Sequence, residues 1–159
     1  ALSTFVGQNL GAKQYDRVKK GVRFGVLCSV TLAELVGVAI FFFGNDLVAL
    51  FGNDPDMVAY GARQARVEAL AYFLLAFSHC IAGIMRGAGK ATVPMFTMLI
   101  SWCAIRIIYI TVMIRQFNRI EVIFSAYPLT WFISSVIFLV YFLKADWLHN
   151  FDRLEGKKS

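Results

Sequence analysis

The chain has 159 residues, of which 58% are hydrophobic and 16% are charged, and its mean hydropathy is +0.63. A soluble domain has roughly 45–50% apolar residues and about 25% charged residues, so this composition excludes an ordinary soluble protein. The net charge of +6 does not indicate a nucleic-acid partner, because the basic residues cluster at the ends of apolar runs, where lipid headgroups lie.

Four long apolar stretches follow one another along the chain, at about 24–43, 67–85, 91–114 and 122–143. Each has about the 20 residues that an α-helix needs to cross the hydrocarbon core of a bilayer. The runs are continuous rather than alternating, which argues against β-strands. Backbone amides in lipid have no water to bind, so the spans must be helical. The predicted fold is an all-α integral membrane protein with four transmembrane helices.

The segments that flank the first span give further predictions. Residues 1–12 have the composition of the end of a preceding helix, in which Gly7 and Gly11 would let a neighbouring backbone approach closely. The chain also begins with Ala and has no signal peptide, so we expect it to be part of a longer protein. The sequences GND at 44–46 and GNDP at 52–55 are strong helix breakers. Residues 47–51 are therefore expected at the outer interface, followed by a helix that Asp54 caps and Pro55 begins.

The distribution of basic residues predicts which ends of the spans face the cytoplasm. Most of them lie before the first span, between spans two and three, and in the tail 144–159. This group comprises Lys13, Arg17, Lys19, Lys20, Arg23, Arg86, Lys90, Lys144, Arg153, Lys157 and Lys158. The opposite connectors carry Arg63, Arg66, Arg115 and Arg119. The positive-inside rule places the richer side and the C-terminal tail in the cytoplasm.

Ionisable residues within the spans are candidates for function, because a charge near the bilayer centre costs about 2.5–3.5 kcal/mol on insertion scales. Glu34 is a candidate for binding a coupling ion, with a structural pairing to Arg106 or to a neighbouring hydroxyl as the alternative. Arg106 is expected to form an ion pair or bind helix carbonyls rather than touch substrate. His79 is expected to be an interior histidine, with a proton relay as the alternative. Glu68, near the outer end of span two, is expected to face a cavity or pair with Arg63 or Arg66.

Aromatic side chains in spans two and four are candidates for stacking on a cationic organic ligand, although aromatic residues in membranes often face lipid. The candidates are Tyr72, Phe73, Phe77, Tyr127, Trp131 and Phe132.

The sequence predicts no catalytic, metal or cofactor site. Cys28, Cys80 and Cys103 lie within apolar runs at spacings that fit neither a disulfide framework nor a zinc site. The GAGK sequence at 87–90 fails the phosphate-loop pattern, because position 84 is isoleucine and position 91 is alanine. No Ser-His-Asp arrangement or carboxylate pair is visible, so we expect no enzyme.

Several blocks of the sequence closely resemble the multidrug and toxic compound extrusion (MATE) transporters. They are FVGQNLGAKQYDRVKKGV, LFGNDPDMVAYGARQARVEALAYF, IMRGAGKATVPMF, ISWCAIRIIYI and AYPLTWFISS. Members of this family have twelve helices in two six-helix lobes around a central cavity. The resemblance implies that this chain holds the end of helix 8 and helices 9 to 12 of the C-terminal lobe, and that the N-terminal lobe is its partner.

The resemblance also implies a function. A family member is expected to be a secondary active antiporter of the bacterial inner membrane that exports amphipathic or cationic drugs in exchange for H⁺ or Na⁺ by alternating access. Some members carry a cation-binding Asp midway along helix 10, but the corresponding stretch around Leu75 has no acidic residue. The family-signature residues are expected to position cytoplasmic helix ends. They are Gly7, Gln8, Gly11, Arg86, Gly87 and Gly89.

Two alternative functions remain open at this point. A lipid-linked oligosaccharide flippase of the same superfamily would need a strongly basic cavity, for which only Arg106 is available. A self-contained four-helix exporter that works as a homo-oligomer would depend on Glu34.

Overall fold

The computed structural model describes residues 1–52, 54–117 and 119–148, and all regular elements in these ranges are helical. This confirms the all-α prediction. In chain order the helices are α1 (Leu2–Gly11), α2 (Tyr15–Ala49), α3 (Pro55–Ala69), α4 (Tyr72–Gly87), α5 (Thr92–Met98), the π-helix η1 (Leu99–Ile105), α6 (Arg106–Phe117) and α7 (Glu121–Lys144).

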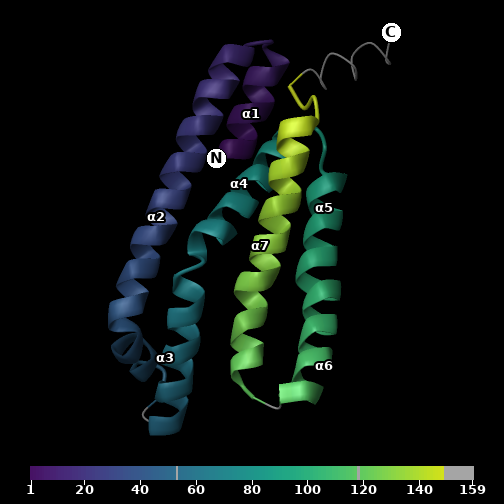
Figure 1. Cartoon of the computed structure of the whole chain (residues 1–159). Coiled ribbons are helices and arrows are strands. Elements are labelled where there is room, and N and C mark those ends of the chain that lie inside the picture. The colour runs from purple at the N-terminus through teal and green to yellow at the C-terminus, as the bar shows by residue number, and fades with distance from the viewer. Residues whose placement is uncertain (53, 118, 149–159) are drawn as a thin grey trace.

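The long helices run up and down, so alternate connectors share an end of the molecule. The α1–α2 and α4–α5 connectors and the end of α7 lie at one end, and the α2–α3 and α6–α7 connectors lie at the other (Figure 1). The connectors predicted to be cytoplasmic are therefore grouped as the charge pattern requires. Most of the predicted tail, 149–159, lies outside the described residues.

Three of the helical units are long and apolar enough to cross a membrane: α2, the continuous run from α5 through α6 (Thr92–Phe117), and α7. A fourth span results if α3 and α4, which are bent by 57° at the break between them, are counted together. The predicted span at 67–85 is therefore not one straight helix, since it begins in α3 and crosses the break. No Pro or Gly lies at residues 70–71, so local sequence gave no sign of this bend.

Helix α2 is longer than predicted. It continues through Gly44, Asn45 and Asp46 to Ala49, so these residues do not end the helix as expected. A glycine inside a helix costs only about 1 kcal/mol relative to alanine. Gly44 is buried beside the backbone of Ala62 in α3, where a small residue permits close packing. The predicted start of the next helix is confirmed, because the Asp54 carboxylate accepts hydrogen bonds from backbone amides in the first turn of α3.

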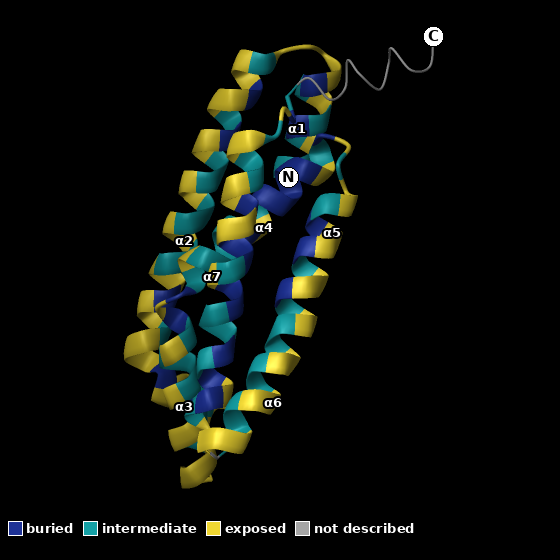
Figure 2. Ribbon diagram, turned by 45° about the vertical axis from the view of Figure 1, so that its right-hand side comes forward, coloured by how far each residue is buried: buried dark blue, intermediate teal, exposed yellow. Residues whose placement is uncertain are grey.

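Burial is concentrated on α4 and α7, whereas α2, α5 and α6 present large apolar side chains at the surface (Figure 2). Phe24 and Phe42 on α2 are 70% and 71% exposed, and Ile107 on α6 is 65% exposed. Such apolar faces are suited to lipid or to further helices rather than to water.

Glycines bring the predicted family-signature segments at 7–12 and 86–90 into contact. A Cβ placed on Gly87 in α4 would lie 2.5 Å from the backbone oxygen of Ser3 and 3.0 Å from Cβ of Val6 in α1, and one on Gly7 would lie 3.3 Å from the Gly87 oxygen. The close approach expected at Gly7 is therefore confirmed. The close approach expected at Gly11 is wrong for the described part of the chain, where no atom of another element lies within 4 Å of a Cβ placed on this residue.

The end of α4 is closed by a glycine in the left-handed conformation. Gly89 has φ 77°, its amide donates to the Arg86 oxygen, and the Lys90 amide donates to the Met85 oxygen. This is the Schellman arrangement, which satisfies the last carbonyls of a helix. Gly89 therefore stops α4 and turns the chain towards α5.

Hydroxyl groups join α4 to α7 in the interior. Ser78 of α4 is buried, and its Oγ lies 3.1 Å from Ser134 Oγ and 2.9 Å from Ser135 Oγ of α7. Ser134 donates to the Trp131 carbonyl and Ser135 to the Leu74 carbonyl. Because both α7 protons are used in this way, the single Ser78 proton is shared between the two α7 oxygens.

Replacing Gly87 by alanine is expected to destabilise the protein by about 1–3 kcal/mol, because the new methyl group would push α1 away from α4. The matched control is Gly83→Ala in the same helix, where no described atom of another element lies within 4 Å of the added Cβ. That change is expected to be neutral or stabilising by up to about 1 kcal/mol. Thermal unfolding of the detergent-purified variants measures the difference, and equal melting of Gly87→Ala and wild type would contradict the contact.

Ser78→Leu is expected to destabilise the α4–α7 interface by about 1–3 kcal/mol, because a fully buried site has no room for the larger side chain. Ser78→Ala removes only the shared hydrogen bond, for which about 0.6 kcal/mol is typical in a membrane. Unfolding midpoints should therefore fall in the order wild type, alanine, leucine. Identical midpoints for all three proteins would show that Ser78 does not pack against α7.

Candidate functional site

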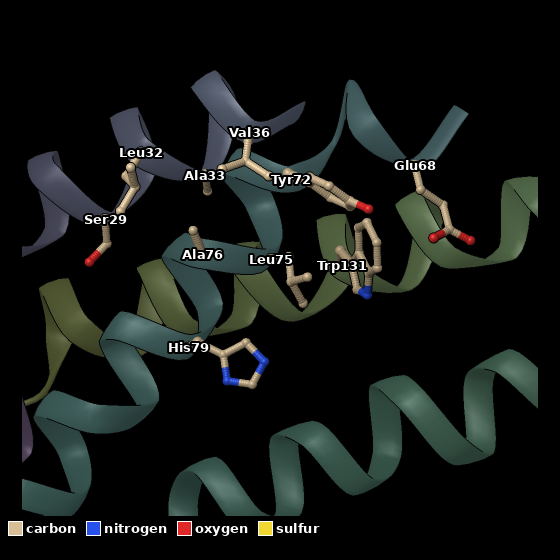
Figure 3. A pocket seen from close by; sticks show the side chains of 10 residues that line it. All are labelled: Ser29, Leu32, Ala33, Val36, Glu68, Tyr72, Leu75, Ala76, His79 and Trp131. Atoms are coloured by element: carbon tan, nitrogen blue, oxygen red, sulfur yellow. The ribbon is translucent and has the colours of Figure 1, made fainter. Parts of the chain in front are cut away.

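The main cavity lies between α2, α4 and α7 and has a volume of about 600 Å³. Its walls are mostly apolar, with aliphatic residues making up half of the lining, and α3 contributes one lining residue. The lining residues, shown in Figure 3, are Ser29, Leu32, Ala33, Val36, Glu68, Tyr72, Leu75, Ala76, His79 and Trp131. The cavity forms where the α3–α4 bend turns the outer half of this span relative to the inner half.

One carboxylate and two aromatic rings gather at one end of this cavity. Glu68 lies beside the rings of Tyr72 and Trp131 (Figure 3), whose centroids are 6.1 Å apart. Gln64 Nε2 donates to Glu68 Oε1 at 2.8 Å, one turn earlier on α3. This geometry can hold an organic cation, because a carboxylate supplies the opposite charge and aromatic faces attract cations.

Of the two alternatives predicted for Glu68, the structure has the cavity-lining one and not the pair with Arg63 or Arg66. Arg63 pairs instead with Glu121 of α7 at 2.9 Å, where the two side chains are 60% and 44% exposed. Arg66 donates through Nε to the Phe41 carbonyl of α2 at 3.2 Å. Both arginines reach outward from α3 to neighbouring helices, which leaves the Glu68 carboxylate to the cavity.

His79 lies farther along the cavity and is exposed, so it is not the interior histidine that the sequence suggested. Its ring meets the Trp102 ring edge to face, with centroids 5.3 Å apart. Trp102 in turn donates from Nε1 to Ser134 Oγ at 3.2 Å. Trp102 could not be selected from sequence, because its position depends on the π-helix η1, which has no recognised sequence signature.

Glu34 lies on α2 outside this cavity. Its Oε2 atom is buried and has no hydrogen-bond partner, and no ion pair to it is found among the described residues. The alternative pairing with Arg106 is therefore wrong. An isolated carboxylate within a span is costly when ionised, so this oxygen is a candidate for binding a proton or a small cation.

Arg106 lies at the start of α6, directly after η1. Its Nη2 donates to Thr130 Oγ1 of α7 at 2.7 Å, and its guanidinium carbon lies 4.3 Å from the centroid of the Tyr127 ring. Arg106 therefore binds a hydroxyl and an aromatic face, rather than the carboxylate or helix carbonyl that was expected. It does not line the main cavity.

The predicted signature residues lie away from this cavity. Gly7, Gly87 and Gly89 shape the α1–α4 contact and the end of α4, as described above, while Gln8 and Arg86 are exposed at the same end. The role expected for the six residues in positioning cytoplasmic helix ends stays a prediction. Of the six aromatic candidates, Tyr72 and Trp131 line the main cavity, and Tyr127 contacts Arg106 instead.

Comparisons with known proteins agree with these features. The MatE family model matches residues 1–112. The probable multidrug resistance protein NorM of Thermotoga maritima is 29% identical over 118 residues, which cover 74% of this chain and 25% of that protein. Multidrug and toxin extrusion protein 2 of Homo sapiens is 26% identical over 145 residues, which cover 89% of this chain and 24% of the relative.

A third relative, the probable multidrug resistance protein YoeA of Bacillus subtilis, is 19% identical over 144 residues, which cover 89% of this chain and 31% of the relative. The chain thus spans about a quarter to a third of the length of these proteins. The family model covers well over half of the chain, including the α1–α4 contact and the cavity residues of α2, α3 and α4, but not α7. The chain therefore belongs to the MatE family, the multidrug and toxic compound extrusion proteins that its motifs resemble.

Proposed function

We propose that this chain forms part of a secondary active antiporter that exports amphipathic, cationic drugs and toxins in exchange for H⁺ or Na⁺ by alternating access. The observation that carries the proposal is the cavity in which Glu68 lies beside Tyr72 and Trp131. Aliphatic walls suit the apolar body of such a compound, and the carboxylate with its two rings suits the cationic group. The names of the relatives, which include multidrug resistance and toxin extrusion proteins, support the same substrate class.

The charge of the cavity favours drug export over the flippase alternative. A phosphate-bearing lipid-linked sugar requires basic groups, whereas no Arg or Lys lies among the residues that line this cavity. Its ionisable lining residues are Glu68, Tyr72 and His79. An organic cation is the better match.

Coupling is assigned to Glu34. Its buried, unpartnered oxygen is located in α2, one of the helices that form the cavity. A proton or Na⁺ would neutralise the carboxylate within the membrane, and release of that ion would restore the unfavourable charge. The ion-bound and ion-free forms of Glu34 would therefore differ in free energy. Such a difference allows an ion gradient to drive a conformational change.

The surroundings in this proposal are the bacterial inner membrane and the remaining helices of the transporter. The large apolar side chains exposed on α2 and α6 would face lipid or these helices. The end of the molecule that carries the basic connectors and the tail 144–159 would lie in the cytoplasm. The N-terminal lobe would complete the cavity from the opposite side.

Glu68→Gln is expected to raise the KM for export of ethidium about tenfold, because loss of the opposite charge removes roughly 1.4 kcal/mol of binding. The control is Asp46→Asn, which removes the charge of an exposed carboxylate on α2 that does not line the cavity. Export is measured in cells that express the full reading frame, with an uncoupler added to show dependence on the gradient. An unchanged KM in Glu68→Gln would remove Glu68 from the substrate site.

Glu34→Gln keeps the shape of the side chain and removes its charge, so it is expected to bind ethidium normally while losing gradient-driven export. Proteoliposomes with an imposed pH gradient, and separately with an imposed Na⁺ gradient, identify the coupling ion. Glu34→Asp, which keeps the charge, is expected to retain part of the activity. Wild-type rates for Glu34→Gln under both gradients would show that coupling occurs elsewhere.

A further inference from the structure

Arg106 carries a positive charge in the middle of a span. It lies roughly 20 Å from the Thr92 end of the α5–η1–α6 span and roughly 16 Å from the Phe117 end, at 1.5 Å per residue. A guanidinium group at this depth needs a compensating partner.

The surroundings of Arg106 supply hydrogen bonding without negative charge. Thr130 accepts from Arg106 Nη2 and donates its own proton to the Tyr127 carbonyl at 3.0 Å. The Tyr127 ring covers one face of the guanidinium group. The buried Nε has no partner, and the described part of the chain places no carboxylate within ion-pair distance.

The two carboxylates within the spans do not fill this role. Glu34 has an unpartnered oxygen of its own, and Glu68 is bonded to Gln64 at the cavity. The free Nε edge of Arg106 therefore faces no opposite charge from either. A guanidinium edge presents parallel N–H groups, which match the two oxygens of a carboxylate or phosphate.

The backbone before Arg106 is specialised in a way that favours a binding role. The seven residues of η1 form a π-helix, and α-helices usually contain such widened turns only as short insertions, often at functional sites. Around this segment both Trp102 and Arg106 reach α7, at Ser134 and Thr130 respectively. The widened turn thus directs Arg106 between α6 and α7.

We propose that Arg106, Thr130 and Tyr127 form an anion-binding subsite, separate from the main cavity, that takes the carboxylate or phosphate group of an amphiphile. The apolar part of the ligand would lie against the exposed isoleucines of α6, Ile107 and Ile108, which directly follow Arg106 in sequence. An amphiphile fits better than a free inorganic ion, because its tail brings the charged group into the hydrocarbon region. This inference does not depend on the proposed export of cations.

The test measures binding of 2-bromododecanoate to the purified protein from the full reading frame, in phosphatidylcholine nanodiscs. Bromine next to the carboxylate is expected to quench the fluorescence of Trp102 and Trp131, which lie near the subsite. We expect saturable quenching that 2-bromododecanol, with no charge, does not produce. Trp102→Phe and Trp131→Phe assign the signal to these residues.

Arg106→Gln is expected to weaken binding of the carboxylate by at least about tenfold, whereas Arg115→Gln, on the exposed end of the same helix, should bind like wild type. Arg106→Lys keeps the charge and is the second variant, used in case Arg106→Gln does not fold. It should bind the carboxylate more weakly than wild type, because a lysine lacks the paired donors. Wild-type binding by both Arg106 variants, or no preference of the wild type for the carboxylate over the alcohol, would overturn the proposal.

Adding phosphatidylglycerol to the nanodiscs identifies the source of the anion. Competition with 2-bromododecanoate would assign the subsite to a lipid phosphate, and absence of competition would assign it to a free amphiphile.

Ethidium export by Arg106→Gln is measured in parallel. Normal export with weakened carboxylate binding would separate this subsite from the proposed cation pathway, and failure of export in wild type would count only against that pathway.

Discussion

Close packing of α4 through small side chains is the interaction on which the rest of the structure depends. Gly87 allows the α1 backbone to reach α4, and Ser78 allows α7 to do so on another part of the same helix. Buried Ile81 and Met85 fill the space between these contacts. In lipid there is little hydrophobic force between helices, so packing of this kind and interhelical hydrogen bonds hold them together. The cavity, whose wall includes Tyr72 and His79 of α4, takes its shape from this arrangement.

Apolar length and charge placement predicted most of the fold, because these are the properties that the bilayer selects. The cap at Asp54 was also predictable, since a capping side chain acts on amides two and three residues away. The α3–α4 bend and the π-helix were not, because tertiary packing sets them without Gly or Pro at the bend. For the candidate site, sequence selected Glu68, Tyr72 and Trp131, but partners such as Gln64 and Thr130 depend on how the helices rotate against each other.

The charges of this protein fall into two groups with different physics. Arg63 and Glu121 pair at an exposed end, where water screens them and the pair contributes little to stability. Glu34 and Arg106 lie within spans, on helices at opposite sides of the bundle (Figure 1), and each keeps an unpartnered polar atom. Had they met, each would have neutralised the other and left no charge for a ligand. Their separation is the reason that both are candidates for binding.

The length of α2 has a consequence for how the protein responds to its membrane. With 35 residues in one unbroken helix, α2 is about 52 Å long, well beyond a hydrocarbon core of about 30 Å. Its apolar stretch, about 24–43, matches that thickness, so the polar ends of the helix project beyond the core, and a bilayer of different thickness would change the tilt of α2. Because Arg66 binds the Phe41 carbonyl near the far end, a change of tilt would be transmitted to α3. A change in bilayer thickness would thus move α3, the outer half of the bent span, through its hydrogen bond to α2.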